Sequence, residues 1–341
     1  MIRSSRRILL GLVGAVLAGA LARAAEPAPV IALSNAYYGN TWRHQMVESF
    51  QAAAEQARQQ GLISDYVVLN GDGSVNQQMS QMSDLILKHV DAIAIDAASE
   101  SALNGIITKA CQAGIKVVVF DSITNTPCAT KLNFDFSGYP VELTEDVVHL
   151  IGDKGNVIIV RGVKGSAPDH DIYASQIKTL AKFPAVKVVA TVYGQATTSV
   201  AQSAVANVLP SLPHVDAVLG QGGGDDYGIA QAFEQFGGPY ADKPPVIAGG
   251  GSSNFIHWWA EQANKNGYRT VSMNTTPGIG AAAFWLTLDI VKGAQAANYM
   301  NMPVATVTQQ NLAEFAGMKP GTIVSPSYSD EWVRANLLGK K

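Results

Sequence analysis

Short apolar segments alternate with longer amphipathic segments over the first half of the chain, and this alternation restricts the fold more than any other feature. Each apolar segment is nearly continuous, which is typical of a strand buried on both faces of a parallel sheet. The amphipathic segments carry apolar residues at helical spacing. Strands are therefore predicted at 30–35, 65–71, 91–96 and 115–121, with helices at 41–61, 74–90 and 101–114. This order predicts βαβ units.

The same alternation begins again after a break near residues 132–135. Five further strands are predicted at 155–162, 186–194, 215–222, 244–251 and 268–274, with helices at 196–212, 226–237 and 278–293. A chain of 341 residues with 47% hydrophobic content is long enough for two cores. The fold class is therefore α/β, with two doubly wound parallel-sheet domains of similar size.

The N-terminus has the layout of an export signal. Three arginines precede an apolar stretch at 8–21, and the sequence Ala22-Arg23-Ala24 resembles a cleavage site. The stretch is too short and wrongly flanked for a stable membrane span. Residues 1–25 are therefore predicted to be a cleaved signal peptide, and the mature protein is expected outside the cytoplasm. Adjacent arginines leave the twin-arginine route open as an alternative to general export.

The charge of the mature chain excludes some partners. The signal holds four of the 24 basic residues and none of the 27 acidic ones, so the mature chain is acidic. An acidic surface argues against nucleic acid and against anionic membranes as partners. The chain is expected to be a monomer.

Of the two cysteines, Cys111 lies at the end of a predicted helix and Cys128 follows the next predicted strand. In an oxidising compartment they can form one disulfide or remain two separate thiols, and the sequence leaves both open. They are not a metal pair, because no Cys or His lies at ligand spacing. No metal and no other cofactor is expected.

Known catalytic and nucleotide-binding motifs are missing from the chain. The glycine-rich segment 219–228 lacks the dinucleotide fingerprint, because Asp225 stands where the third glycine is required. No P-loop, G-x-S-x-G elbow or paired-histidine motif occurs. The chain is therefore not expected to be an enzyme.

Asp169, His170 and Asp171 are consecutive and allow more than one interpretation. They can form the wall of a polar pocket, or begin a helix with Asp169 as N-cap. They can also be acid/base groups of a secreted sugar-active enzyme, a role that Asp121 can equally fill. No nucleophile accompanies them, so wall or cap is favoured and the enzyme stays the alternative.

Residues that follow the predicted strands match the needs of a neutral hydroxylated ligand, because ligands of such sheets bind beyond the carboxyl ends of the strands. Carboxylate and amide groups hydrogen-bond hydroxyls in a fixed geometry, and aromatic rings cover C–H surfaces. One strand-to-helix junction supplies Asn35, Tyr37, Tyr38, Asn40, Trp42 and Arg43, and another supplies Asp121.

With these motifs in order, the mature chain resembles the ribose-type (type I) periplasmic substrate-binding proteins of ABC sugar importers. The segment "IALSNAYYGNTW" is similar to the family's first strand and its cleft residues, and "KVVVFDSITN" to the strand that ends in a sugar-gripping Asp. The resemblance implies two lobes that exchange strands and close about a three-crossover hinge. It implies an N-terminal lobe of residues 26–133 plus 275–312, and a C-terminal lobe of residues 134–274 plus 313–341.

The second lobe departs from the family pattern in its side chains. Gly222 and Gly223 replace an Asn-Asp pair, Gly250 replaces a second gripping Asp, and the usual Arg is missing from segment 162–172. Loss of side chains enlarges a pocket or brings backbone N–H groups to the ligand. The resemblance therefore implies a sugar, polyol or related hydroxylated molecule rather than ribose itself, with a furanose-like signalling molecule as an alternative.

The resemblance also implies a partner and a set of ligand-binding residues. The partner is an ABC permease of the inner membrane, to which the closed, loaded protein delivers its ligand. The identity and ring form of the ligand and the identity of the permease stay open. The predicted ligand-binding residues are Asn35, Tyr37, Tyr38, Asn40, Trp42, Arg43, Asp121, Ser122, Asp169, His170, Gln195, Gln221, Gly222, Asp225, Gly250 and Asn274.

Overall fold

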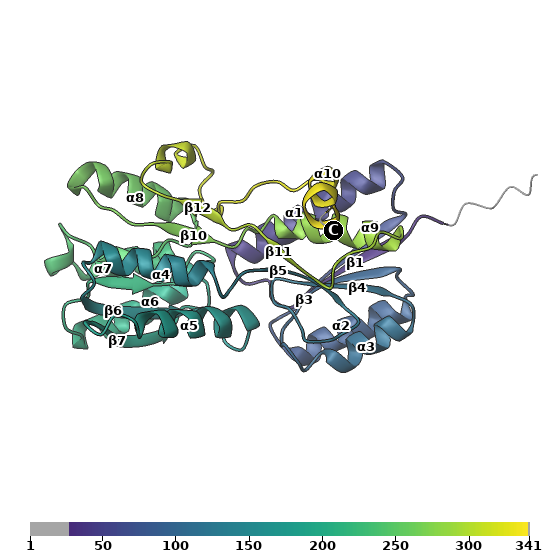
Figure 1. Cartoon of the computed structure of the whole chain (residues 1–341), viewed down its shortest axis with the longest axis horizontal. Coiled ribbons are helices and arrows are strands. Elements are labelled where there is room, and N and C mark those ends of the chain that lie inside the picture. The colour runs from purple at the N-terminus through teal and green to yellow at the C-terminus, as the bar shows by residue number, and fades with distance from the viewer. Residues whose placement is uncertain (1–26, 340–341) are drawn as a thin grey trace, which may run out of the picture.

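Two parallel β-sheets with helices on both faces form the two halves of the molecule (Figure 1). The structure is a computed structural model that describes residues 27–339. The predicted signal peptide at 1–25 lies outside the described residues. Each sheet with its helices is called a lobe here, the first lobe holding the six-stranded sheet and the second the four-stranded sheet.

The first lobe has strand order β11-β5-β4-β3-β1-β2, and every pairing is parallel. Helices α1 and α9 pack together on one face, and α2 and α3 lie on the other (Figure 1). The strands are β1 (Val30–Asn35), β2 (Asp65–Asn70), β3 (Ala92–Asp96), β4 (Lys116–Phe120), β5 (Thr130–Phe134) and β11 (Tyr299–Met302). The helices are α1 (Thr41–Gln59), α2 (Val75–Leu87), α3 (Asn104–Gln112) and α9 (Ile279–Val291).

The second lobe has strand order β7-β6-β8-β9, again parallel throughout. Helices α4 and α5 pack on one face, and α6 and α7 on the other. The strands are β6 (Gly155–Arg161), β7 (Val186–Tyr193), β8 (Ala217–Leu219) and β9 (Val246–Ile247). The helices are α4 (Tyr139–Leu150), α5 (Ala167–Leu180), α6 (Thr198–Val208), α7 (Asp225–Phe236) and α8 (Ser253–Asn266).

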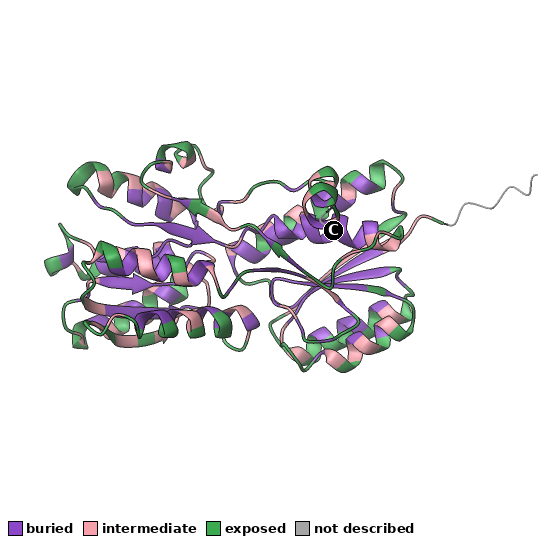
Figure 2. Ribbon diagram, viewed as in Figure 1, coloured by how far each residue is buried: buried purple, intermediate pink, exposed green. Residues whose placement is uncertain are grey.

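Nearly continuous apolar sequence makes the inner strands, such as β1, β3 and β6, the buried centre of each lobe (Figure 2). The edge strands β2 and β7 are only partly buried. In β1, Ile31 and Leu33 face the layer that contains α1 and α9, while Ala32 faces the layer that contains α2 and α3. The predicted α/β class with parallel sheets is confirmed. Strands β8 and β9 are shorter than predicted, since their predicted ranges extend into glycine-rich loops in which Gly222 and Gly251 have left-handed backbone.

Four segments carry the chain between the lobes, one more than the three crossovers that the resemblance implies. They lie between β5 and α4, between β10 (Ser272–Asn274) and α9, between β11 and β12 (Ala305–Val307), and between β12 and α10 (Asp330–Val333). Strands β10 and β12 pair antiparallel beside the second lobe, and α10 packs on α9 in the first lobe. The chain therefore enters the second lobe between β11 and β12 instead of at the predicted division 312/313, and it returns to the first lobe before α10.

Cys111 and Cys128 form a disulfide with their Cα atoms 6.5 Å apart. The bond joins the end of α3 to the loop that follows β4. Of the two alternatives that the sequence left open, the structure has the bonded one.

Within residues 27–339, the helices are all too short or too polar to cross a membrane. The same part of the chain holds no group of three or more His, Cys, Asp or Glu side chains placed to bind a metal ion.

Candidate functional site

A cavity of about 60 Å³ lies between the lobes, where the carboxyl ends of both sheets meet. Residues from strand-to-helix junctions of both lobes and from the connecting segments surround it. They are Asn40, Trp42, Arg43, Asp121, Phe136, Tyr139, Gly162, Val163, Ser166, Pro168, Asp169, Ile172, Ala196, Gln221, Gly223 and Thr275. Six of them are predicted ligand-binding residues, namely Asn40, Trp42, Arg43, Asp121, Asp169 and Gln221.

Arg43 is the charged centre of the first-lobe wall. Its side chain is only 8% exposed and forms an ion pair with the buried Asp96, while Nη2 lies 3.5 Å from Oδ2 of Asp121. Nη1 also donates to Oδ1 of Asn35 at 3.3 Å. Burial lowers the pKa of Arg43 from its usual value, and the charge of Asp121 opposes that shift. One guanidinium therefore faces two carboxylates.

Asp121 projects into the cavity from the end of β4 with a backbone that is unusual for this residue type. Its φ is +54°, in the left-handed region that few residues other than glycine adopt. Such strained backbone tends to occur at functional sites. Burial raises the pKa of the Asp121 carboxyl, and the charge of Arg43 opposes the rise. With Arg43 shared between two acids, the first-lobe wall carries an excess negative charge when both are ionised.

The first turn of α1 fixes an aromatic face at the cavity. Asn40 caps the helix by accepting a hydrogen bond from the backbone N–H of Arg43 at 2.8 Å. The indole Nε1 of Trp42 donates to the carbonyl of Thr275 at 2.9 Å. Trp42 is therefore held in one orientation and connects the first lobe to the segment that follows β10.

Asp169 and Gln221 supply polar side chains to the second-lobe wall. Asp169 forms a two-point ion pair with Arg161, and its backbone carbonyl accepts from Nε2 of Gln221 at 3.2 Å. Gln221 in turn accepts from the N–H of Gly162 at 2.9 Å. The suggested N-cap role of Asp169 is wrong, because Ser166 caps α5 and accepts from the N–H of Asp169.

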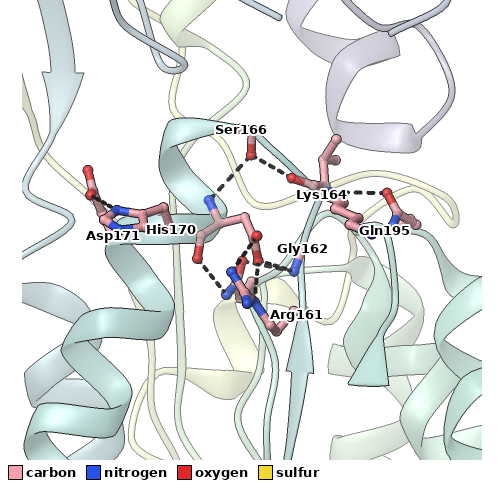
Figure 3. A network of polar contacts seen from close by, with 10 residues as sticks. Arg161, Gly162, Lys164, Ser166, His170, Asp171 and Gln195 are labelled. Carbon is pink, nitrogen blue, oxygen red and sulfur yellow. Dashed lines mark hydrogen bonds and ion pairs between the residues drawn. The ribbon is translucent and has the colours of Figure 1, made fainter. Parts of the chain in front are cut away.

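The consecutive residues 169–171 do not form one cluster. Asp169 is buried, whereas the side chains of His170 and Asp171 are 78% and 50% exposed and pair with each other. Figure 3 shows His170 and Asp171 apart from Arg161 and Gly162. Helical geometry explains the separation, since successive residues of α5 point about 100° apart. His170 therefore lies outside the cavity wall.

Two buried carboxylates, Asp225 and Asp226, begin α7 behind the second-lobe wall. Asp225 accepts from the N–H groups of Gln221 at 2.8 Å and Gly222 at 3.1 Å. Asp226 accepts from the N–H of Gly250 at 2.8 Å and from the hydroxyl of Ser252 at 2.5 Å. The pair therefore holds together the two glycine-rich loops that follow β8 and β9.

The environment of these two acids changes their protonation. Burial, and next the charge of Asp226, raise the pKa of Asp225 to about 8. Burial also raises the pKa of Asp226, and the hydrogen bond from Ser252 opposes that rise. With a pKa of about 8, the Asp225 carboxyl is largely protonated at neutral pH.

Gly222 and Gly250 pack backbone against backbone. A Cβ atom on Gly250 would lie 2.4 Å from the Cα of Gly222, closer than any real contact. Their N–H groups donate to Asp225 and Asp226, so they are not free for a ligand. The sequence predicted that Gly222 and Gly250 enlarge the pocket or offer N–H groups to the ligand. In the structure their role is different, because the absence of side chains lets the two loops touch.

The other predicted residues support the wall or lie away from it. Asn35 holds Arg43, and Asn274 donates to the carbonyls of Thr275 and Val324. Ser122 is buried behind Asp121, and Gln195 accepts from the N–H of Lys164. Tyr37 and Tyr38 do not line the cavity: the ring of Tyr37 lies against Gly39, and Tyr38 is 39% exposed with its ring tilted by 39° from that of His44.

Several cavity residues were not predicted from the sequence. Phe136 lies on the first connecting segment just past β5, Tyr139 is the first residue of α4, and Ile172 lies more than one turn into α5. Burial, with the charges of Asp121 and Asp225, raises the pKa of Tyr139, so its phenol stays protonated. An aromatic pair next to the seam at 132–135 was the signal that could have identified Phe136 and Tyr139.

The fold and the site together define a two-lobed binding protein with its cavity at the hinge. The sequence profile described as "Periplasmic binding protein domain" matches residues 31–295, and the chain belongs to this family. Its architecture is the type I periplasmic binding protein fold, as the resemblance implied.

Solved and curated relatives agree with that assignment. The chain is 39% identical to an ABC transporter solute-binding protein from Thermobispora bispora, over 90% of this chain and 94% of that one, with a TM-score of 0.84. A solute-binding protein from Mycobacterium smegmatis with bound glycerol is 19% identical, covers 88% of this chain and 100% of its own, and has a TM-score of 0.76.

A curated relative matches over a shorter part of the chain. The chain is 25% identical to a xylitol-binding protein of Mycolicibacterium smegmatis over 170 residues. That match spans 49% of each chain, so the chain covers about half the length of this relative.

Proposed function

We propose that the protein captures a neutral sugar, polyol or related hydroxylated molecule in the periplasm and delivers it to an ABC permease. The observation that carries this proposal is the pair of carboxylates that face one cavity from opposite lobes, Asp121 and Asp169. Carboxylates accept hydrogen bonds from hydroxyl groups, and the face of Trp42 suits the C–H surface of a sugar or polyol. Solute-binding relatives with glycerol bound, and the xylitol-binding relative, support this ligand class.

The charges around the cavity favour an uncharged ligand. Arg43 faces both Asp96 and Asp121, and the charge of Arg161 is matched by Asp169. Both arginines are thus already paired with carboxylates and do not offer a free positive charge to an anionic ligand. The carboxylate or phosphate of such a ligand would be buried next to net negative charge. Sugar acids and phosphorylated sugars are therefore expected to bind poorly.

Closure of the two lobes is the proposed mechanism of capture. A ligand that contacts both Asp121 and Asp169 binds the closed form more tightly than the open form, so it shifts the population toward closure. The closed monomer would then be recognised by the permease. The chain's family and its solved relatives are solute-binding proteins, and the chain is proposed to act as a binder rather than an enzyme.

A thermal-shift screen of the mature chain tests the proposal. The ligands are glycerol, xylitol, myo-inositol, D-arabinose and D-allose, each tested at increasing concentration. A ligand present at one hundred times its Kd adds about 2.7 kcal/mol to the stability and raises Tm. Each hit is compared with the acid of the same carbon skeleton, for example D-arabinose against D-arabinonic acid.

We expect at least one neutral compound to raise Tm, and its acid counterpart to have little effect. Shifts produced only by phosphorylated compounds or amino acids would contradict the proposal. Disappearance of the added compound, with a new product detected by chromatography, would instead support the enzyme alternative.

A further inference from the structure

Arg161 lies directly behind the carboxylate that the second lobe presents to the cavity. It is the last residue of β6, and Asp169 is in the first turn of α5. Nε of Arg161 donates to Oδ1 of Asp169 at 3.0 Å, and Nη2 donates to Oδ2 at 2.7 Å. Asp169 lines the cavity and is 2% exposed, whereas Arg161 is not among the residues of the wall.

Two tyrosines hold the guanidinium of Arg161 in place. Its Cζ lies 4.1 Å from the ring centroid of Tyr173 and 4.9 Å from that of Tyr193. Cation–π contact on both rings, together with the two-point ion pair, removes the rotational freedom of a long side chain. Arg161 therefore neutralises Asp169 from outside the cavity instead of turning toward a ligand.

Hydrogen bonds to the Asp169 carboxylate leave one of its oxygens incompletely used. Oδ1 accepts from Arg161 and also from the N–H of Gly162 at 3.2 Å. Oδ2 accepts only from Arg161 among the described residues. A carboxylate has about four acceptor positions, two on each oxygen. One position on Oδ2 is therefore open on a side chain that lines the cavity.

We propose that Arg161 is a positioning residue that acts through Asp169. It fixes the carboxylate and compensates its charge, so that Oδ2 accepts a hydrogen bond from one hydroxyl of the ligand. Asp121 of the first lobe accepts from another hydroxyl, which requires a ligand with hydroxyl donors directed to both lobes. This inference rests on the proposed function, since it names how the same cavity holds its ligand.

The test is titration calorimetry of the mature protein with glycerol, xylitol, myo-inositol, D-arabinose and D-allose. The variants are Arg161→Gln, Arg161→Lys, Asp169→Asn and the double variant Arg161→Gln/Asp169→Asn. The matched control is Arg334→Gln, because Arg334 forms a similar two-point ion pair with Asp289 at 3.1 and 2.7 Å, on α9 and away from the cavity.

We expect Arg161→Gln to weaken binding about tenfold or more, as loss of a hydrogen bond to a charged group does. Arg161→Lys should recover part of that loss, because it restores the charge without the two-point geometry. The double variant should bind no worse than Asp169→Asn alone, since Arg161 acts only through Asp169. Arg334→Gln should bind as the wild type does.

If Arg161→Gln fails to fold, the double variant still allows the inference to be tested. Removing one partner leaves a buried charge unpaired, whereas removing both is tolerated better. Binding by Arg161→Gln or Arg161→Lys equal to wild type, or additive losses in the double variant, would overturn the inference while the proposed function stands. If the wild type binds none of the five compounds, the proposed function fails and the inference fails with it.

Discussion

The two walls of the cavity are built in different ways. The first-lobe wall consists of side chains that reach inward from strand ends, with Trp42, Arg43 and Asp121 at its centre. The second-lobe wall is formed largely by backbone and small residues, such as Gly162, Ala196 and Gly223. Asp169 is its one acidic side chain, and two further acids, Asp225 and Asp226, lie behind it and hold loops.

This difference shows that a carboxylate near a cavity has more than one use. Asp121 lines the cavity, and Arg43 compensates its charge only in part. Asp226 instead accepts hydrogen bonds from the N–H of Gly250 and from the N–H and hydroxyl of Ser252. The first wall should therefore respond to mutation mainly in ligand affinity, and the buried acids and glycine loops behind the second wall mainly in stability.

The largest effect is expected from Gly250→Ala in the second wall. Its Cβ would lie 2.4 Å from the Cα of Gly222, and both loops are fixed by hydrogen bonds to buried acids. Overpacking against fixed backbone should lower the free energy of unfolding by about 3 kcal/mol. The measurement is the midpoint of urea unfolding without ligand.

Gly105→Ala is the matched control for this substitution. Gly105 lies in α3 with nothing within 4 Å of its Cβ position and no left-handed backbone. Alanine there should stabilise the protein by about 0.5–1 kcal/mol, because glycine is a poor helix former. Equal stability of Gly250→Ala and wild type would show that the glycine loops have room to separate.

Asp121→Asn in the first wall should lower affinity with little change in the unfolding midpoint. The amide keeps the shape but loses the charge that strengthens a hydrogen bond from a ligand hydroxyl, which predicts a 10- to 100-fold loss, about 1.5–3 kcal/mol. Calorimetric titration with whichever screened compound the wild type binds measures it. His170→Ala, at an exposed side chain, is the control and should bind normally.

If Asp121→Asn lowers stability but not ligand affinity, the proposed difference between a ligand-binding first wall and a structural second wall is wrong. Asp121 would then belong with Asp225 and Asp226 as an acid that holds structure. Loss of affinity in His170→Ala would restore His170 to the site and contradict the position of its side chain in α5.

The sequence was sufficient for the first wall and for most strands of the two sheets, although β5, β11 and β12 were not predicted. Nearly continuous apolar strands predict parallel sheets, and parallel sheets bring the residues after β1 and β4 to one edge. Asn40, Trp42, Arg43 and Asp121 follow those strands directly, so local sequence decides their position.

The second wall depends on contacts that local sequence does not contain. The direction of Arg161 is decided by Tyr173 and Tyr193, which come from a different helix and a different strand. The roles of Gly222 and Gly250 depend on two loops touching, and nothing in either glycine run indicates its partner. Asp169 and His170 are adjacent in sequence, but the helix directs them to different environments.

Taken per pH unit, the effect of pH on stability is the smallest, and it separates the two walls by protonation. Burial and the neighbouring Asp226 raise the pKa of Asp225 from 3.8 to about 8 in the folded protein. Between these values the folded state holds a proton that the unfolded state has released. The contribution of Asp225 to stability is therefore fully present below about pH 4 and is lost as pH rises toward 8.

Urea unfolding of the ligand-free protein between pH 5 and 8 measures this loss in wild type and in Asp225→Asn. The wild-type free energy of unfolding should fall by up to about 1 kcal/mol per pH unit, below the limit of about 1.4 that one proton sets. Asparagine does not titrate, so the variant should show a weaker slope. An unchanged slope would mean that hydrogen bonds from Gln221 and Gly222 keep Asp225 ionised, and that both walls carry charged acids at neutral pH.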